Sequence, residues 1–400
     1  MKKFTSVAAG LLGLVAVPVM AQSTVTLYGL VDAAVVYQTK QATGTRTGID
    51  AGQLATSRWG MRGSEDLGGG MKAFFNIEST LINDSGASGL GFGGGTAGGT
   101  TTSLFDRAAL VGLSGDFGSV SLGRQNILGV DSIGQGDPIG LAHPATNPNV
   151  AFSALNAGAI YQSFGTNGGG AALRQNNSIR YLTPVFSGFG GALMYGAGER
   201  AGSSSAGAYK GISGYYRSGQ SGIALAYATL NNSPSAAVGA TPAVTSDKLT
   251  LWGGGLKYAI SDVWTLRGTY AQNKQDLSQR KIAVAGLGVE YSFRPGFSLT
   301  GAYYNTKSTG QTATNGKADQ YYAIGKYALS KRTTMYTTLT HARAGSSGPN
   351  DRALTVGLVG DPSARTANRV AVGVLHTFYK RPFSKKNRLN GGFFASSHLN

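Results

Sequence analysis

The chain has 400 residues, including 62 glycines, 19 tyrosines, 11 prolines and no cysteine, and its formal net charge is +17. The lack of cysteine excludes a small scaffold held by disulfide bonds, and abundant aromatic residues with few prolines argue against a disordered chain. A basic excess often indicates nucleic acid or an anionic surface, but no nucleic-acid-binding motif accompanies it, so no nucleic-acid partner is expected.

The first 21 residues have the pattern of a secretory signal peptide. Lys2 and Lys3 precede an apolar run from Val7 to Met20, and cleavage is expected after Ala21. The run is too short to span a bilayer. The alternative is an uncleaved anchor, and the mature chain is expected to leave the cytoplasm in either case.

The rest of the chain is dominated by alternating segments. In 281–293, 296–307 and 370–378, apolar side chains alternate with small or polar ones. This period of two indicates strands with one apolar face. We recognise no amphipathic helix.

The connections between these segments alternate in length. Short connections with the composition of tight turns occur at 65–70, 114–119, 183–188, 217–222, 259–263, 292–296 and 329–332. Longer polar or glycine-rich connections occur at 38–56, 81–103, 127–176, 199–205, 231–245, 275–280, 308–316 and 345–366. Fifteen connections join 16 strands, and this layout predicts an all-β fold, a transmembrane 16-stranded antiparallel β-barrel. The barrel must close, because an open edge would leave backbone groups unsatisfied in hydrocarbon.

The stretch SRWGMRGSED at 57–66 predicts what the two faces of one strand meet. Arg58 and Arg62 share one parity, and Trp59 and Met61 share the other. In a barrel the arginines would line a water-filled lumen and the apolar pair would face lipid. The alternative is a soluble β-sandwich with the arginines on its solvated face.

Six segments carry a family resemblance: VTLYGLVDA (25–33), SRWGMRGSEDLGGGMKAFFNIE (57–78), FDRAALVGLSGDFGSVSLGRQ (105–125), NNSIRYLTPVFSGFGGALMYG (176–196), YALSKRTTMY (327–336) and NRVAVGVLHTF (368–378). They resemble the general trimeric porins of Gram-negative outer membranes, in particular the betaproteobacterial branch with neisserial and Burkholderia-type members. The resemblance implies a channel in the cell outer membrane for passive diffusion of small hydrophilic solutes and ions. It also implies a homotrimer that contacts outer-membrane lipid and lipopolysaccharide and is inserted by the barrel-assembly machinery.

The resemblance further implies a pore constriction. The longest connection, 127–176, would fold into the lumen and place its acids, Asp131 and Asp137, opposite a basic wall. The positions that match this wall are Arg58, Arg124 and Arg174, with Arg180 an equally close candidate for the last position, and its extensions are Arg62, Lys72, Arg107 and Arg180. The loop 81–103 resembles the segment that reaches a neighbouring subunit.

The charge balance predicts a preference for anions. Segment 22–378 contains 28 basic and 18 acidic residues, and charged residues that line a pore select ions by sign. The alternative is that many of these charges lie at the rims and leave the selectivity weak.

The C-terminal region departs from the family pattern. Family members end at an aromatic residue that the assembly machinery reads, which makes Phe378 the expected assembly signal, yet a basic tail follows at 379–400. This tail is expected to be a disordered periplasmic extension, with binding of acidic partners as the alternative. Leu375 also departs, because its lumenal parity would suit a polar residue.

No chemistry of catalysis is recognisable, and neither a metal nor a cofactor is expected. None of the four histidines has an evident Ser and carboxylate partner, and no GxSxG motif occurs. Gly89, Gly91 and Gly94 match GxGxxG, but no helix follows them. An enzymatic barrel and an adhesin or receptor barrel are the rival classes of function.

Overall fold

A computed structural model describes residues 24–88, 104–153, 173–198, 205–231, 248–277, 279–310 and 315–378. The predicted signal peptide and the tail 379–400 lie outside these residues, as do parts of the loops predicted at 81–103, 127–176 and 231–245. No helix in these ranges has the length and apolar character needed to cross a membrane.

Sixteen antiparallel strands form a closed barrel, as the sequence predicted. The strand segments are β1 (Thr24–Gln41), β2 (Gly44–Ala51), β3 (Arg58–Gly68), β4 (Met71–Ile82), β5 (Ala87–Ser88), β6 (Ala108–Gly115), β7 (Gly118–Asn126), β8 (Arg174–Leu182), β9 (Phe189–Gly196), β10 (Tyr209–Ser218), β11 (Ser221–Asn231), β12 (Lys248–Ala259), β13 (Trp264–Gln275), β14 (Lys281–Arg294), β15 (Phe297–Thr309), β16 (Gly316–Ala328), β17 (Thr333–Ala344) and β18 (Thr366–Phe378). β2 and β3 pair with successive halves of β1 and share one place in the wall. β5 pairs only with the end of β4. The barrel closes where β1 pairs with β18, from Gly29↔Phe378 to Gln38↔Arg369.

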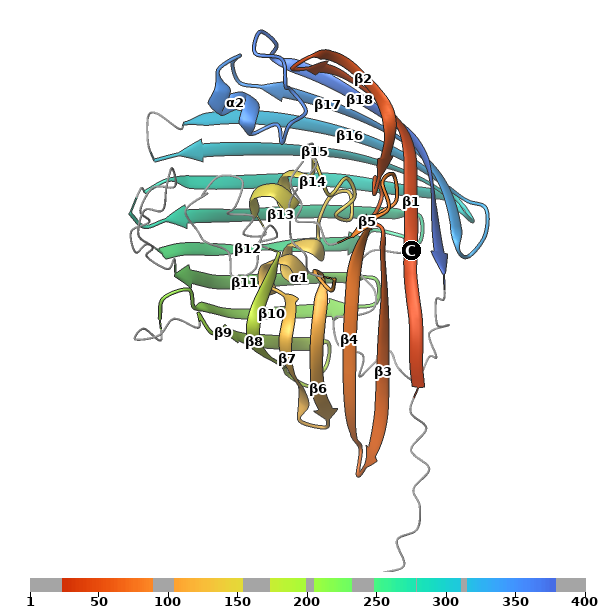
Figure 1. Ribbon diagram of the computed structural model, residues 1–400, viewed down its shortest axis with the longest axis vertical. Coiled ribbons are helices and arrows are strands. Elements are labelled where there is room, and N and C mark those ends of the chain that lie inside the picture. Colours follow the sequence, from red (N-terminus) through yellow and green to blue (C-terminus); the bar gives the residue numbers. More distant parts are fainter. Residues whose placement is uncertain are drawn as a thin grey trace, which may run out of the picture.

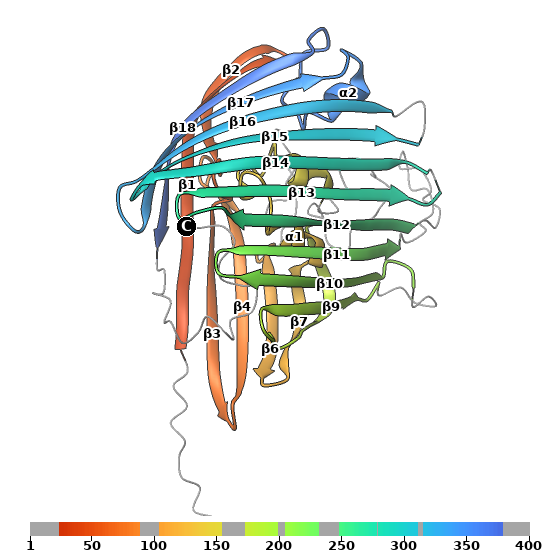
Figure 2. The ribbon, with the colours of Figure 1, turned by 180° about the vertical axis from the view of Figure 1, so that it is seen from behind.

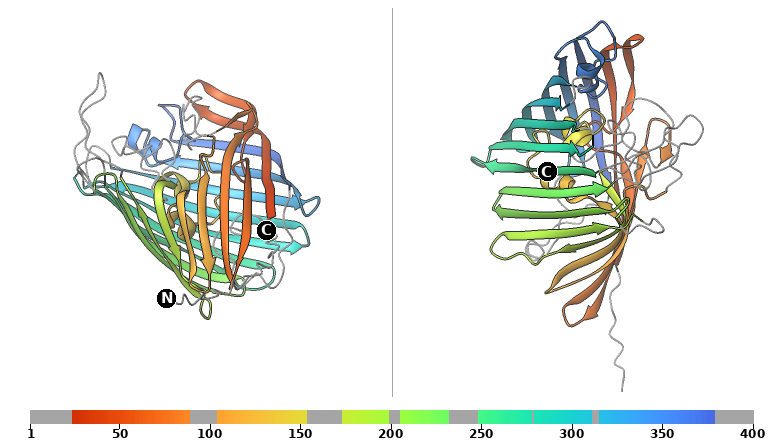
Figure 3. Two further views of the ribbon diagram at one scale, coloured as in Figure 1. Left: turned by 60° about the horizontal axis from the view of Figure 1, so that its bottom comes forward. Right: turned by 90° about the vertical axis from the view of Figure 1, so that its left-hand side faces the viewer.

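The strands are steeply tilted. In Figure 1 the strands β1, β3, β4, β6 and β7 cross the direction of β11–β16 on the other wall, and the reverse view in Figure 2 shows the same crossing. Closing a sheet into a barrel requires such a tilt. Each of the seven predicted tight turns joins two consecutive strands, so the turns gather at one end of the barrel and the long loops at the other. The two further views in Figure 3 show the wall curving around the interior.

The two faces of the wall differ as the alternation predicted. On β18, Val372 and Val374 are 51% and 43% exposed, whereas Ala371 and Leu375 are 0% and 3% exposed. The outward side chains of β18 are therefore apolar and exposed, whereas its inward side chains are buried. Leu375 points inward and packs with Leu30 of β1.

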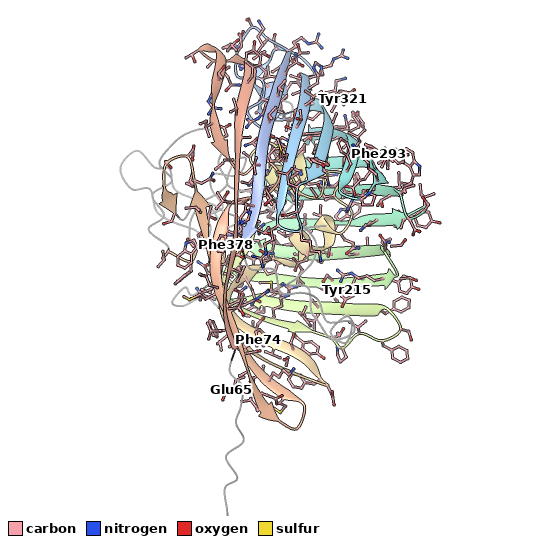
Figure 4. The ribbon with its side chains drawn as sticks, turned by 90° about the vertical axis from the view of Figure 1, so that its right-hand side faces the viewer. Glu65, Phe74, Tyr215, Phe293, Tyr321 and Phe378 are labelled. Carbon is pink, nitrogen blue, oxygen red and sulfur yellow. The ribbon has the colours of Figure 1, made fainter. Side chains whose placement is uncertain are left out.

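Aromatic side chains form a belt on the outer face near the turns. The rings of Trp264, Tyr291, Phe293, Phe297 and Tyr327 follow one another with centroid distances of 4.3, 5.6, 4.6 and 5.8 Å. Figure 4 labels Phe293 of this belt. Such belts mark the interface between hydrocarbon and water around membrane barrels.

The connection after β7 packs inside the barrel. Its helix α1 (Leu128–Gly134) contacts β10, β11 and β12, and the π-helical turn Asn149–Ser153 contacts β13 and β14. Leu128 is fully buried with Leu249 and Leu251, which point inward from β12. Figure 1 shows α1 between the two walls.

Glycine permits the close approach of this loop to the wall. A Cβ atom on Gly136 would collide with the backbone of Leu256 and Gly268, and a Cβ on Gly255 would collide with the backbone of Gly136. The loop therefore lies directly on the backbone of β12 and β13, which draws it to one side of the lumen.

Candidate functional site

The wall opposite the loop carries a cluster of basic side chains around Glu78 of β4. Arg107, just before β6, donates from Nε to Glu78 Oε1 at 2.5 Å. Arg58 of β3 lies close enough to both groups for electrostatic interaction. Tyr28 of β1 donates its hydroxyl to Glu78 Oε2 at 2.9 Å. Glu78 thus forms an ion pair with Arg107 and attracts the nearby Arg58 on the inner face of the barrel.

Two further arginines extend this cluster from β7 and β8. Arg124 donates from Nε to the carbonyl oxygen of Asp106 at 2.6 Å, and its guanidinium group also donates to Asn176 Oδ1. Arg174 is buried and interacts electrostatically with Arg107, Arg124, Glu78 and Asp106. We call Arg58, Arg107, Arg124 and Arg174 the basic wall.

A register irregularity directs Arg124 toward the cluster. The pairing of β7 with β8 shifts between Gly123 and Gln125, and Gly123 has φ +123°. A bulge of this kind re-aims the side chains beyond it. Strand parity counted along β7 therefore does not fix the direction of Arg124.

Arg62 and Lys72 of the predicted extension lie outside the basic wall, as does Arg180, which forms an ion pair with Asp131. Arg62 points inward, with its guanidinium carbon 4.9 Å from the centroid of the Tyr28 ring. Lys72 is exposed beside the β3–β4 turn, six residues from Glu78, or roughly 20 Å along the strand. Arg62 thus borders the basic wall, whereas Lys72 lies at the turn-side mouth.

Asp131 and Arg180 join the loop to the barrel wall. Asp131 on α1 accepts from Arg180 Nη2 at 2.6 Å, and the side chains are 13% and 2% exposed. Asn126 also donates to Asp131, at 3.4 Å. Of the two candidates on β8, Arg174 belongs to the basic wall, and Arg180 holds the loop through an ion pair.

Asp137 organises the loop and does not present its charge to the lumen. Its carboxylate is fully buried and accepts from the Leu141 amide at 2.6 Å, from Asn149 Nδ2 at 2.8 Å and from the Tyr304 hydroxyl at 3.1 Å. Burial raises the pKa of Asp137, and these hydrogen bonds oppose the rise. This placement differs from the expected one, because Asp137 faces β15 and not the basic wall.

The part of the loop between Asp137 and the π-helical turn is held through His143 and Thr146. The His143 amide donates to Gln53 O at 2.6 Å, and the Tyr322 hydroxyl donates to Thr146 O at 2.9 Å. The His143 ring is buried against Tyr322, with a centroid distance of 5.4 Å. Burial, together with the charge of Arg369, lowers the pKa of His143 to about 3, so the imidazole stays neutral while the loop is packed.

Sequence reasoning missed three members of the cluster around Glu78, namely Glu78 itself, Asp106 and Tyr28. Glu78 shares the inward parity of Lys72 and Asn76 in 71–82, so the alternation of β4 could have found it. Asp106 precedes Arg107 directly, and its carboxylate accepts from Thr80 N and Thr80 Oγ1, both at 2.7 Å. No local sequence pattern predicts these hydrogen bonds between Asp106 and Thr80, which are 26 residues apart. In the ranges that the structure describes, no group of three His, Cys, Asp or Glu side chains could hold a metal ion.

Comparison with known proteins identifies the family. Outer membrane porin protein 32 of Delftia acidovorans is 32% identical over 378 residues, which cover 90% of this chain and 95% of the relative. A major outer membrane protein of Neisseria gonorrhoeae is 30% identical over 215 residues, or 52% of this chain and 53% of the relative. Among solved structures, the anion-selective porin from Comamonas acidovorans has a TM-score of 0.68 and 26% identity, covering 89% of this chain and all of that chain. A model of the Gram-negative porin family matches residues 5–347. The chain therefore belongs to the Gram-negative porin family, and its closed barrel is an outer-membrane channel for the passive diffusion of small hydrophilic solutes.

Proposed function

We propose that this channel prefers anions and that the basic wall creates the preference. The observation that carries the proposal is the position of the wall relative to the loop. The two helical parts of the loop, α1 and the π-helical turn, pack on β10–β14, and the segment between them reaches β15, β16 and Gln53. The basic wall comes from β3, the start of β6, β7 and β8, across the ring of strands from the helical parts. A solute that passes the loop must pass these guanidinium groups.

The charges in this passage favour anions. Four guanidinium groups form the basic wall, and two carboxylates, Glu78 and Asp106, lie among them. Low-dielectric barrel walls focus the field of such groups into the lumen. Charged side chains that line a pore select ions by sign. The solved porin named as anion-selective, which has the same fold, supports this assignment.

We further propose that the functional unit is a homotrimer. Outward side chains on β1 and β6, such as Val25, Leu27, Val111 and Leu113, are aliphatic and exposed. The aromatic belt described above lies on β13–β16 instead. Tyr37 on β1 and Phe117 at the β6–β7 turn are exposed as well, but in the described residues they form no row of contacting rings like the belt. A mainly aliphatic face of this kind suits contact with a second copy better than contact with the lipid interface. The belt side would meet outer-membrane lipid and lipopolysaccharide.

Phe378 is proposed as the signal that the barrel-assembly machinery reads. It is the last residue of β18, and its ring packs over Gly29 of β1 at the seam that closes the barrel. Figure 4 labels Phe378 beside β1. Insertion of this strand completes the closure.

Charge-neutral substitutions test the anion preference. Arg58→Gln and Arg174→Gln should each lower the chloride-to-potassium permeability ratio, measured as a reversal potential in planar bilayers under a KCl gradient. Arg294→Gln is the matched control, because Arg294 is exposed at the β14–β15 turn beside Phe293 and Phe297. Equal ratios in the wild type and in all three variants would exclude the basic wall as the selectivity element.

A further inference from the structure

A second group of basic side chains lines the lumen on the wall that carries the loop. Arg217 of β10, Lys257 of β12, Arg267 of β13 and Lys326 of β16 form this group, which we call the turn-side strip. Three members lie in one row of the sheet, because Arg217 pairs with Gly222, Gly222 with Lys257, and Lys257 with Arg267. Lys326 lies four residues from Tyr322, where this row crosses β16, and joins the group through Glu290. Their parity is that of the buried, inward residues Leu251 and Ala271.

The strip places like charges directly opposite each other. Lys257 and Arg267 are Cα partners on neighbouring strands, and each lies within electrostatic reach of the other. Like charges in this arrangement destabilise a sheet. Glu290 of β14 is the carboxylate among them, and it already accepts from Lys326 Nζ at 3.1 Å and from Thr300 Oγ1 at 3.3 Å. The four basic side chains and this carboxylate thus carry a net charge of +3.

The strip lies directly on the turn side of the loop. Gly136 packs on Gly255, two residues before Lys257, and Pro138 packs on Gly288, the register partner of Arg267. Arg217 Nη2 donates to Gln135 Oε1 of the loop at 3.0 Å. A solute that enters from the turn-side mouth therefore meets the strip beside the loop. The basic wall lies across the lumen.

We propose that the turn-side strip binds small dianions, of which inorganic phosphate is the simplest. A dianion between Lys257 and Arg267 relieves their mutual repulsion, whereas a single chloride neutralises only one of them. The guanidinium group of Arg267 offers two parallel donors to adjacent oxygens, and the ammonium group of Lys257 adds a third donor direction. The site goes beyond the anion preference proposed above, because it selects anions by their charge number.

Thermal stability provides a test that does not depend on conduction. Phosphate should raise the melting temperature of the folded wild-type protein above that in KCl of equal ionic strength. The double variant Lys257→Gln/Arg267→Gln should lose this increment. The increment of each variant is measured against its own melting temperature without phosphate, because the substitutions remove both the repulsion between the two bases and their attraction to Glu290. Lys331→Gln/Arg332→Gln, at the exposed β16–β17 turn, is the control with the same charge change and should keep the increment.

A blocking experiment locates the site in the pore. Phosphate added on the turn side should reduce the single-channel chloride current, and the Lys257→Gln/Arg267→Gln variant should need at least tenfold more phosphate for the same block. Equal block and equal stabilisation in the wild type, this variant and the turn control would overturn the proposal. It would also be overturned if Arg58→Gln abolished both effects, because the phosphate site would then be the basic wall. The KCl reversal potential reports the anion preference separately, so that preference can stand even if the dianion site fails.

Discussion

The charge of Glu78 should limit the anion preference of the channel. Its carboxylate is the anionic centre of the cluster, 2.5 Å from Arg107 Nε and 2.9 Å from the Tyr28 hydroxyl. The substitution Glu78→Gln keeps the size of the side chain and removes one negative charge from the lumenal wall. Arg58 and Arg107 would then act on a passing ion without this opposing charge.

Coulomb's law gives the size of the effect. A unit charge about 7 Å from the ion path contributes about 0.6 kcal/mol in water, and screening at about 0.1 M salt reduces this to about 0.3 kcal/mol. Removal of the charge stabilises an anion and destabilises a cation by the same amount, so the permeability ratio should rise about threefold. At about 1 M salt the Debye length falls to about 3 Å and the effect should nearly vanish.

The assay is the reversal potential of Glu78→Gln at both salt concentrations, after the folded state has been confirmed by heat-modifiable migration on a gel. Asp116→Asn is the matched control, because it removes one negative charge at the exposed β6–β7 turn. Asp116 lies eight residues beyond Ala108, the register partner of Glu78, or about 26 Å away along the strand. A permeability ratio that is unchanged, that falls, or that changes equally in the control would refute the electrostatic reasoning.

Three further predictions concern the loop and the C-terminus. The pKa of His143 in the packed loop, about 3, lies below the ordinary value of 6.5, so the packed loop binds fewer protons than the released loop. The free energy that favours the packed loop over the released loop should therefore fall by about 2 kcal/mol between pH 7 and pH 5. Hydrogen exchange at residues 142–147, corrected for intrinsic rates, should therefore accelerate on acidification, and His143→Gln should abolish this pH dependence. Gly136→Ala should displace the loop from β12 and β13, increasing current noise in single-channel records while the strand content stays unchanged. Gly214→Ala, with open space at the new Cβ, should behave like the wild type, and equal noise in both variants would contradict the packing argument. Truncation after Phe378 should raise the yield of folded trimer in parallel expression, because the assembly signal becomes terminal, and equal yields would exclude that role.

The barrel itself was predictable because its determinants are local. The side-chain period of two and the composition of the turns are properties of short segments, and they suffice for the strand number and for the inward direction of Arg58 and Arg62. The aromatic and aliphatic outer faces follow from the same alternation.

The details of the site were less predictable because they depend on distant parts of the chain. Asp137 is held by Tyr304, 167 residues later in the sequence, so its position in a long loop could not show that its charge is buried. The direction of Arg124 depends on the irregularity after Gly123. The pairing of Lys257 with Arg267 depends on strand register, and a slip of one residue would turn each side chain to the other face.

The most direct test of the account is the reversal potential of the purified wild-type protein under a KCl gradient, with single-channel conductance recorded in the same membrane. The account predicts open steps and a potential of anion-selective sign, which weakens as salt screens the basic wall. Open steps with a potential of cation-selective sign would contradict the assignment of selectivity to Arg58, Arg107, Arg124 and Arg174.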